Sequence, residues 1–408
     1  MTYIQRGLEA TLAAATAAFP AVMVSGPRQT GKTTLLREQF GRNYRYVSLE
    51  QPPIRTLARQ DPGGFLDVYR APVILDEIQC APELLPFIKE RIDADRGRRG
   101  QYLLTGSQNL LLMETVSETL AGRTAVLRLY PLARRELDGE PALPLPWEPV
   151  QELREMDPDA FVRRQIFCEQ LLIGGYPDVV RGPAGNRTLW FASYVQTYVE
   201  RDVRQLRQIG DLGQFQHFVK AVALRSGQLF NLSDVARDLG LAINTVKAWL
   251  SVLEASGLVV ILHPYFENAG KRLVKTPKVY FTDTGLLCHL VGITTAEQLA
   301  LSSFGGAVME TAVLMEVVKA LSFRGPPPSL YFWRTSNGTE VDLVLDTGGR
   351  LMPIEAKLTA TPRAAMGRGI MAFRETYGDR TAPGWVVYSG DHRLPLGNGI
   401  LALPFSML

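Results

Sequence analysis

The sequence has few cysteines and histidines, and this scarcity excludes several kinds of site. It contains three cysteines, Cys80, Cys168 and Cys288, which lie far apart and form no CxxC pair. The spacing therefore supports neither a zinc site built on paired thiolates nor a disulfide framework. The four histidines are scattered and indicate no metal ligand. A reduced, cytoplasmic environment is the expectation from this cysteine usage.

Long apolar runs and a strong net charge are also missing. No apolar run approaches the ~20 residues that a membrane-spanning helix needs, so we expect no membrane partner. The formal net charge is only +3 over 408 residues. Bulk charge therefore does not indicate a nucleic-acid partner, and any basic surface must be local.

What is present is the composition of an ordinary globular chain with several domains. Hydrophobic residues make up 46% and charged residues 21%, which allows sizeable cores. The length predicts about two to four domains. Prolines gather between Pro131 and Pro149, which marks a boundary. We expect an ATPase domain over 1–140, a helical linker or lid over 141–212, a winged-helix domain over 213–292 and a terminal domain over 293–408.

Short apolar runs alternate with helical patterns in the N-terminal part of the chain. Strands are predicted at 21–25, 44–49, 73–75, 102–105 and 124–129. This alternation is typical of a parallel sheet with helices on both faces.

Residues 26–33 match the phosphate-binding motif GxxxxGK(S/T) in full, between a predicted strand and a predicted helix. Backbone N–H groups of such a loop and the helix N-terminus face the phosphates of a nucleotide. Lys32 is then expected to reach the β- and γ-phosphates, and the Thr33 hydroxyl to ligate Mg²⁺. The loop residues expected to bind ATP are Gly26, Pro27, Arg28, Gln29, Thr30, Gly31, Lys32, Thr33 and Thr34.

An acidic pair, Asp76 and Glu77, follows the apolar run Val73–Leu75. Asp76 at the end of a central strand can bind ATP through the magnesium shell, and Glu77 can orient or deprotonate the attacking water. An acidic helix start has the same pattern. A full phosphate loop upstream favours ATP hydrolysis with Mg²⁺ as the interpretation.

The next strand ends in Thr105-Gly106-Ser107. A polar side chain there is expected between Asp76 and the γ-phosphate, with Ser107 as first choice and Thr105 as second. A simple helix N-cap is the alternative.

Arg123 lies just before the last strand of the predicted sheet. We expect it to act catalytically by pointing across a subunit boundary at a neighbour's nucleotide, where it would stabilise transition-state charge. A solvated surface arginine is the alternative, and Arg134 and Arg135 are further candidates for the same role.

The order of these motifs resembles the AAA+ superfamily of ATPases. It continues with Tyr130-Pro131-Leu132, with Gly174-Gly175-Tyr176-Pro177 and with residues 197–202, which is similar to a large group of prokaryotic AAA+ ATPases with a C-terminal domain of unknown function. The similarity covers nearly the whole chain. It implies a five-stranded ATPase sheet and ring assembly. A second sensor arginine is not fixed by the resemblance, and the candidates are Arg181, Arg201 and Arg204.

Residues 232–255 have helix-turn-helix organisation. The first helix is expected to be capped by Ser233 and closed by Gly240, and the second spans 243–255 with Trp249 on its apolar face. Strands predicted at 258–262 and 278–281 complete a set that resembles a winged helix.

A winged helix predicts DNA contact through its second helix and its hairpin. Groove contacts are expected from Asn244, Thr245 and Lys247, and phosphate contacts from Lys271, Arg272 and Lys275. A rigid packing module without DNA contact is the alternative.

Two strands, at 340–345 and 350–356, are predicted to form a hairpin that carries Asp342, Glu355 and Lys357. Asp342 and Glu355 can share a divalent cation that activates water, while Lys357 stabilises the developing charge. Glu310, on a predicted helix at 306–321, can complete this metal site.

This spacing resembles the PD-(D/E)xK nuclease fold, which includes Holliday-junction resolvases and restriction enzymes, with Val341 in place of the proline. A docking module that has lost cleavage is the alternative.

The predicted fold class is α/β: an AAA+ P-loop domain with a parallel five-stranded sheet, a helical and winged-helix part, and a small α/β PD-(D/E)xK nuclease-like domain. The expected function is an ATP-hydrolysing ring, hexameric by analogy with AAA+ motors, that acts on DNA as a helicase or in Holliday-junction branch migration. The alternatives are an ATP-regulated, Mg²⁺-dependent DNA endonuclease, a regulatory NTPase switch in defence or signalling, and a protein-binding scaffold.

Overall fold

The computed structural model describes residues 3–107, 116, 118–147, 164–183, 186–198, 212–266 and 275–408. The chain forms two compact units. The first comprises residues 1–142, 252–258 and 319–327, and the second comprises residues 143–251, 259–318 and 328–408. Among the helices of the described residues, none has the length and apolar character needed to cross a membrane.

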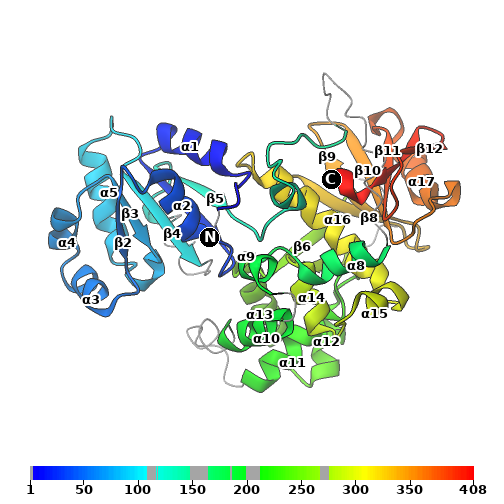
Figure 1. Ribbon diagram of the computed structural model, residues 1–408, viewed down its shortest axis with the longest axis horizontal. Coiled ribbons are helices and arrows are strands. Elements are labelled where there is room, and N and C mark those ends of the chain that lie inside the picture. The colour runs from blue at the N-terminus through cyan, green and yellow to red at the C-terminus, as the bar shows by residue number, and fades with distance from the viewer. Residues whose placement is uncertain are drawn as a thin grey trace. The chain divides into compact units, whose positions relative to one another are not determined.

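The first unit is built on a five-stranded sheet whose neighbouring strands are all parallel (Figure 1). The strand order is β2-β3-β4-β1-β5. The strands are β1 (Ala21–Gly26), β2 (Arg45–Ser48), β3 (Val73–Asp76), β4 (Tyr102–Ser107) and β5 (Thr124–Arg128). The predicted parallel sheet of five strands is confirmed.

Helices cover both faces of this sheet, because alternate side chains of a strand point to opposite sides. Ala21 and Met23 of β1 belong to one apolar core, and Val22 and Val24 to the other. The first core includes residues of α3 (Pro52–Gln60), α4 (Pro62–Val68) and α5 (Leu84–Ala94). The second includes residues of α1 (Glu9–Ala18) and α2 (Lys32–Phe40). A short helix, α7 (Arg134–Leu137), follows β5.

The second unit combines helices with an eight-stranded sheet of order β12-β13-β11-β10-β9-β8-β6-β7. Its smaller helices are α8 (Arg164–Ile173), α9 (Pro177–Arg181), α10 (Arg187–Tyr198), α11 (Leu212–Ala223), α12 (Leu232–Leu239), α13 (Ile243–Ala255), α14 (Thr284–Leu290) and α15 (Ala296–Leu301). Its strands are β6 (Val259–Pro264), β7 (Lys278–Phe281), β8 (Leu330–Arg334), β9 (Glu340–Asp346), β10 (Leu351–Lys357), β11 (Gly384–Tyr388), β12 (Leu394–Gly397) and β13 (Ile400–Pro404).

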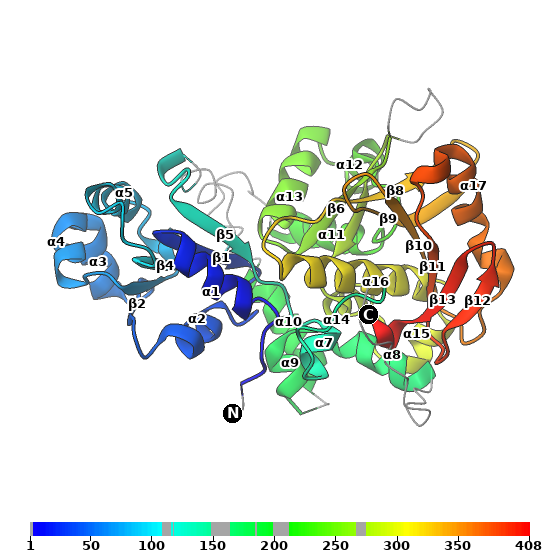
Figure 2. The same cartoon turned by 90° about the horizontal axis from the view of Figure 1, so that it is seen from above.

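The C-terminal part of this sheet is mixed. Strands β8, β9 and β10 form an antiparallel meander, whereas β10, β11 and β13 run parallel. The helices α16 (Gly305–Ser322) and α17 (Arg368–Tyr377) flank these strands in both ribbon views (Figures 1 and 2). The predicted β9–β10 hairpin is therefore present, with Leu343 opposite Ile354.

The predicted winged-helix and terminal domains share this sheet. Strand β6 pairs with β7 as the expected antiparallel hairpin, and its far end pairs in parallel with β8. His263 lies opposite Tyr331 and Pro264 opposite Phe332. The segments 213–292 and 293–408 are thus joined by backbone hydrogen bonds, which local sequence patterns do not reveal.

The two helices of the predicted helix-turn-helix are α12 and α13, with Gly240 in the left-handed conformation at the end of α12. The cap at the start of α12 differs from the prediction. The Asn231 side chain accepts a hydrogen bond from the Ser233 backbone N–H at 2.9 Å, so Asn231 is the cap in place of Ser233. Asparagine is as good a cap as serine, and the cap lies two residues earlier in the chain than expected.

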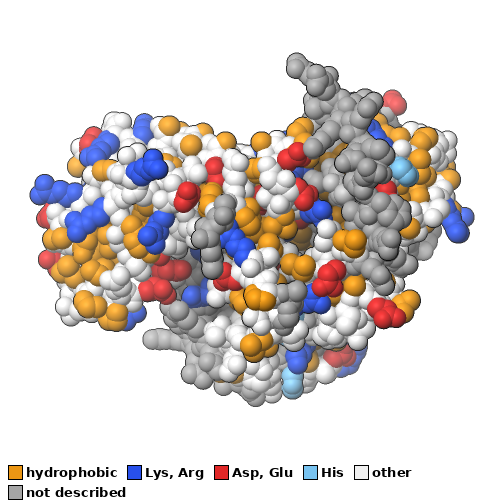
Figure 3. All heavy atoms as spheres, in the orientation of Figure 1, with side chains coloured by type: hydrophobic (Ala, Val, Ile, Leu, Met, Phe, Trp, Pro, Cys, Tyr) orange, Lys and Arg blue, Asp and Glu red, His pale blue; other side chains and the backbone are white. Residues whose placement is uncertain are grey.

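Charged side chains of both signs are interspersed over the face of the molecule that Figure 3 shows. This distribution agrees with the small net charge of +3.

Candidate active sites

The phosphate loop connects β1 to α2 at the edge where the parallel strands end. Gly26 has φ +141°, and a Cβ there would overlap the carbonyl oxygen of Leu129, so only glycine fits. Gly31 has φ +90° and precedes the first residue of α2. Gln29 also has a positive φ, +59°, which is uncommon for a non-glycine residue. Such a loop at a helix N-terminus presents backbone N–H groups to an anion.

Lys32 lies folded along this loop. Its side chain is buried, and its Nζ donates to the carbonyl oxygens of Gly26 at 3.1 Å and Pro27 at 2.7 Å. The Thr30 hydroxyl donates to the same Pro27 carbonyl at 3.0 Å. Phosphate oxygens are stronger acceptors than carbonyls, so a bound triphosphate can take over the hydrogen bonds of the ammonium.

Asp76 accepts hydrogen bonds from three hydroxyl groups. Its Oδ1 lies 2.7 Å from Thr33 Oγ1 and 2.6 Å from Thr105 Oγ1, and its Oδ2 lies 2.8 Å from Tyr46 Oη. The structure therefore brings the hydroxyl and the carboxylate that were predicted to serve Mg²⁺ into direct contact. Carboxylate and hydroxyl oxygens are ligands that suit this hard cation, so Asp76 and Thr33 fit Mg²⁺.

Tyr46 was missed by sequence analysis. It lies on β2, the neighbour of β3, and only the strand order places its hydroxyl beside Asp76. Burial and the hydrogen bond to Asp76 raise the pKa of Tyr46 to about 12. The phenol therefore keeps its proton at neutral pH and remains a hydrogen-bond donor.

Glu77 follows β3 directly and has φ +59°. Its backbone N–H donates to Thr105 Oγ1 at 3.0 Å, and its carboxylate accepts a hydrogen bond from the Gln79 side chain. Thr105 thus connects the side chain of Asp76 to the backbone of Glu77. The polar position beside Asp76 is filled by Thr105, the second choice of the sequence analysis. The Ser107 side chain lies outside the described residues, and its role stays a prediction.

Arg123 forms a two-pronged ion pair with Asp93 of its own chain, with N–O distances of 2.8 Å and 3.0 Å. It directly precedes β5, so it lies at the N-terminal ends of the parallel strands, whereas the phosphate loop lies at their C-terminal ends. Its predicted action on a neighbouring subunit therefore stays a prediction.

The other arginine candidates have varied positions. Arg134 forms an ion pair with Asp138 at 2.7 Å, and Arg135 is buried. Arg181 ends α9. Arg201 and Arg204 lie outside the described residues.

Arg6 is a further residue that sequence analysis missed. Its guanidinium is buried and donates to Glu136 Oε1 at 2.9 Å, to the Thr30 carbonyl at 2.7 Å and to the Tyr130 carbonyl at 2.8 Å. It therefore ties the phosphate loop to the segment after β5. An isolated arginine near the start of the chain has no motif that would indicate this role.

The predicted DNA-contacting residues of α13 differ in exposure. Asn244 and Lys247 are exposed, and Thr245 is half-buried. Trp249 packs edge-on against Phe215 and Phe218, in keeping with the expected core position. Lys271 and Arg272 lie outside the described residues, while Lys275 is exposed.

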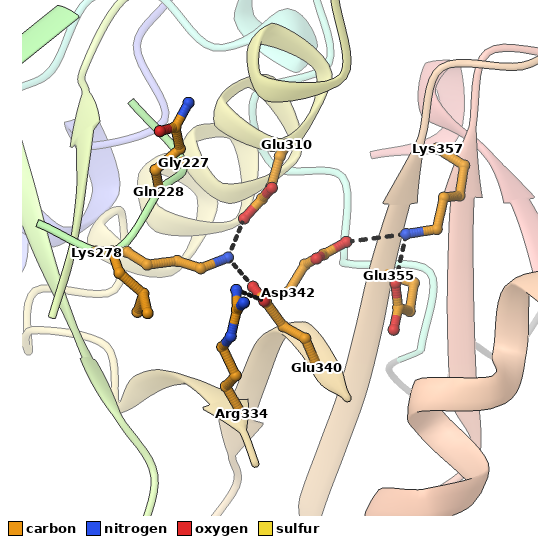
Figure 4. A pocket seen from close by; sticks show the side chains of 10 residues that line it. Gly227, Gln228, Lys278, Glu310, Arg334, Glu340, Asp342, Glu355 and Lys357 are labelled. Carbon is orange, nitrogen blue, oxygen red and sulfur yellow. Dashed lines mark hydrogen bonds and ion pairs between the residues drawn. The ribbon is translucent and has the colours of Figure 1, made fainter. Parts of the chain in front are cut away.

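The predicted residues of the terminal domain lie together on β9 and β10 (Figure 4). Lys357 Nζ lies 2.5 Å from Glu355 Oε2 and 3.4 Å from Asp342 Oδ2. The Ala356 backbone N–H also donates to Asp342 Oδ2, at 2.8 Å. Burial, with the neighbouring Asp342 carboxylate, raises the pKa of Glu355 well above its ordinary value.

Glu310 projects from α16 toward the same cluster, where it contacts residues that sequence analysis missed. Its Oε1 accepts hydrogen bonds from Lys278 Nζ at 2.8 Å and Tyr280 Oη at 2.5 Å. Lys278 also forms an ion pair with Glu340 Oε1. The other oxygen of this carboxylate, Oε2, accepts a hydrogen bond from Arg334 Nη1 at 2.5 Å. A signal for Glu340 existed, because alternation on a strand puts residues 340 and 342 on one face.

One oxygen from each of Glu310, Glu340 and Asp342 lies within 4.8 Å of the other two, an arrangement that could hold a metal ion. The sequence analysis placed Glu355 in this set, whereas Glu355 contacts Lys357. Burial and the Asp342 carboxylate raise the pKa of Glu310 to about 7, against the influence of Lys278. These groups line a cavity of about 600 Å³.

Three family models match successive parts of the chain. An AAA domain matches residues 18–137, and domains of unknown function, DUF8612 and DUF4143, match residues 164–297 and 305–408. The uncharacterized protein Rv2008c of Mycobacterium tuberculosis is 31% identical over 387 residues, which cover 94% of this chain and 80% of the relative. The chain belongs to the same protein family. The AAA domain contains loop 26–33, Asp76 and Glu77, so this family member carries a P-loop ATPase domain of the AAA type.

Two further uncharacterized proteins are also similar to this chain. The uncharacterized protein Mb2031c of Mycobacterium bovis shares the same 31% identity over 94% of this chain and 80% of its own length. An uncharacterized protein of Haemophilus influenzae is 22% identical, over 66% of this chain and 69% of its own.

Two solved structures are similar in part. The Walker-type ATPase PABY2304 of Pyrococcus abyssi has a TM-score of 0.44 at 15% identity, covering 71% of this chain and 96% of its own. Thermotoga maritima RuvB has a TM-score of 0.30 at 18% identity, and the match covers 62% of this chain and 88% of the RuvB chain.

Proposed function

We propose that this AAA ATPase hydrolyses Mg²⁺–ATP at loop 26–33 and uses the energy to act on DNA. The observation that carries the ATPase part is the cluster around Asp76, in which Thr33 and Thr105 donate to one carboxylate oxygen at 2.7 Å and 2.6 Å. This cluster joins the loop, the acidic strand end and the neighbouring strand at one edge of the sheet.

In the proposed reaction, ATP binds with its triphosphate along the loop, and Lys32 exchanges the Gly26 and Pro27 carbonyls for phosphate oxygens. Thr33 and Asp76 would hold Mg²⁺, whose charge offsets that of the phosphates. Glu77 orients the water that attacks the γ-phosphorus and accepts its proton, as the bond to the β–γ bridging oxygen breaks. Thr105 fixes Asp76 and Glu77 relative to each other.

The DNA part of the proposal is supported by the helix-turn-helix of α12 and α13. Asn244 and Lys247 are exposed near the start of α13, the part of a second helix that enters the major groove in this motif. Ring assembly, with six subunits by analogy and Arg123 acting in trans, belongs to this proposal. A helicase or branch-migration motor is its concrete form.

The test is the ATP turnover rate without DNA and with duplex, single-stranded and four-way-junction DNA. The proposal expects several-fold stimulation by at least one DNA, which Lys247→Ala reduces. Lys220→Ala removes an exposed lysine of α11 and serves as the matched control. Equal rates in all four conditions would contradict action on DNA and favour a regulatory switch.

A second candidate function is an ATP-regulated, Mg²⁺-dependent DNA endonuclease. The observation that favours it is the contact of Lys357 with both Glu355 and Asp342 on adjacent strands. Cleavage of a four-way junction or plasmid with Mg²⁺, with and without ATP, tests it. Asp342→Asn and Lys357→Ala are each expected to abolish cleavage. DNA binding without cleavage by the wild-type chain would leave the terminal domain as a clamp.

A further inference from the structure

Lys278 reaches the carboxylates of the terminal domain from β7, far from them in sequence (Figure 4). Its side chain is only 2% exposed. Its Nζ lies 2.8 Å from Glu310 Oε1 and also pairs with Glu340 Oε1. The ring of Phe332 lies 5.4 Å from the ammonium. A buried ammonium in this setting is held by charge and packing together, since leaving it unpaired would be costly.

The carboxylates that receive Lys278 converge as the ligands of a hard divalent ion do. Oxygens of Glu310, Glu340 and Asp342 lie within 4.8 Å of one another, and carboxylate oxygens are the ligands that Mg²⁺ and Mn²⁺ prefer. Lys278 contacts two of these three residues. Its ammonium and a divalent ion therefore compete for the same oxygens.

The net charge of the groups that line the cavity also indicates competition between Lys278 and a divalent ion. The cavity is lined by four carboxylates, Glu310, Glu340, Asp342 and Glu355, and by three cationic groups, Lys278, Arg334 and Lys357. With all of them ionised the sum is −1, and a divalent ion added to this set would bring it to +1. Without Lys278 the sum is −2, which a divalent ion would bring to zero. Counted in this way, a divalent ion leaves the cluster neutral when Lys278 has moved away and with an excess positive charge when Lys278 stays.

We propose that Lys278 is a built-in cation that takes the place of a divalent metal between Glu310, Glu340 and Asp342. The site then admits Mg²⁺ or Mn²⁺ only when Lys278 moves away. This inference deepens the second candidate function and rests on it for its biological meaning, because the terminal domain would cleave DNA only while Lys278 lies away from the carboxylates. The exclusion of metal is a separate property, which can be measured without ATP and without DNA.

The test is Mn²⁺ binding to the full-length chain in the absence of nucleotide, by isothermal titration calorimetry and by electron paramagnetic resonance of free Mn²⁺. Lys278→Met keeps a long unbranched side chain and removes the charge. It is expected to bind Mn²⁺ at least about tenfold more tightly than the wild type, because the coupling of a buried charge pair is released.

Adding Asp342→Asn to Lys278→Met is expected to remove the gained site. Lys220→Met, which removes an exposed lysine of α11, is the control and should leave Mn²⁺ binding unchanged.

The wild-type chain provides a second measurement that does not require Lys278→Met to fold. Wild type and Asp342→Asn are expected to bind the same number of Mn²⁺ ions, since no ion occupies this site while Lys278 is there. Loss of one bound Mn²⁺ in Asp342→Asn alone, or equal affinity of wild type and a folded Lys278→Met, would overturn the proposal. Failure here would leave ATP turnover and its DNA stimulation untouched, whereas failure of those assays would leave the Mn²⁺ result standing.

Discussion

The guanidinium of Arg6 and the carboxylate of Glu136 form a buried ion pair, with Nε and Oε1 separated by 2.9 Å and side chains 4% and 0% exposed. The same guanidinium holds the carbonyl oxygens of Thr30 in the phosphate loop and Tyr130 after β5. One residue near the start of the chain therefore fixes the loop against the end of the sheet. Its role is positional, because the guanidinium contacts a carboxylate and two backbone carbonyl oxygens of the chain itself.

We expect Arg6→Met to destabilise the chain and to weaken ATP binding. The change leaves the Glu136 carboxylate buried without its cation, which costs about 3–5 kcal/mol of unfolding free energy. Because the loop loses its brace at Thr30, KM for ATP should rise more than kcat falls. Urea denaturation and steady-state kinetics measure the two effects. Arg59→Met, which breaks the exposed Arg59–Glu83 pair, should change stability by no more than about 1 kcal/mol. Equal effects of the two changes would contradict the assigned role of Arg6.

Thr105→Val should lower kcat strongly while ATP binding persists. Valine keeps the branched shape but removes the hydroxyl that donates to Asp76 at 2.6 Å and accepts from Glu77 N–H at 3.0 Å. Steady-state ATPase assays measure turnover, and titration with nucleotide measures binding separately. Ser107→Ala is the comparison, since sequence analysis favoured Ser107 for the same role. A larger loss of kcat in Ser107→Ala than in Thr105→Val would restore that first choice.

The phosphate loop, Asp76 and Glu77 could be found from the sequence because each belongs to a motif with fixed spacing. The choice between Thr105 and Ser107 could not be made in this way. Both end the same strand, and which hydroxyl reaches Asp76 depends on the register of β4 against its neighbours, in which Leu75 lies opposite Leu104. A short strand carries no local signal for register when both of its faces are buried.

Contacts between distant segments account for the other residues that sequence analysis missed. Arg6 meets Glu136, and Lys278 meets Glu310 and Glu340, across long stretches of chain. The pairing of β6 with β8 likewise joins two parts that the sequence predicted as separate domains. Periodicity and caps describe neighbours in sequence, and they hold no information on which elements meet in space.

Tyr46→Phe should raise the Mg²⁺ concentration needed for half-maximal ATPase activity. The phenol donates to Asp76 Oδ2 at 2.8 Å, and its loss removes one of three hydrogen bonds that orient this carboxylate. Magnesium titrations at fixed ATP measure the shift. Tyr69→Phe, on the same domain, is the matched control and should leave the titration unchanged. An unchanged Mg²⁺ requirement in Tyr46→Phe would show that the hydroxyl does not orient Asp76.

The stability of the chain should depend on pH through Glu310. Burial raises the pKa of Glu310 to about 7 in the folded chain, above the ordinary value of 4.5 that applies when unfolded. Between these two values the folded state binds more protons than the unfolded state, so this group lowers the free energy of unfolding as pH rises. The uncharged side chain in Glu310→Gln does not lower the free energy of unfolding in this way. The melting temperature of Glu310→Gln relative to wild type should therefore increase from pH 5 to pH 8, and a difference that falls or stays constant would contradict the shifted pKa.

The central claim is that loop 26–33 with Asp76 and Glu77 binds and hydrolyses Mg²⁺–ATP. The most direct measurement combines calorimetric titration of Mg²⁺–ATP with turnover assays on wild type, Lys32→Ala and Glu77→Gln. The account predicts binding and turnover in wild type, loss of both in Lys32→Ala, and retained binding without turnover in Glu77→Gln. A wild-type chain with no measurable affinity for ATP, or a Glu77→Gln variant that hydrolyses ATP at the wild-type rate, would contradict it.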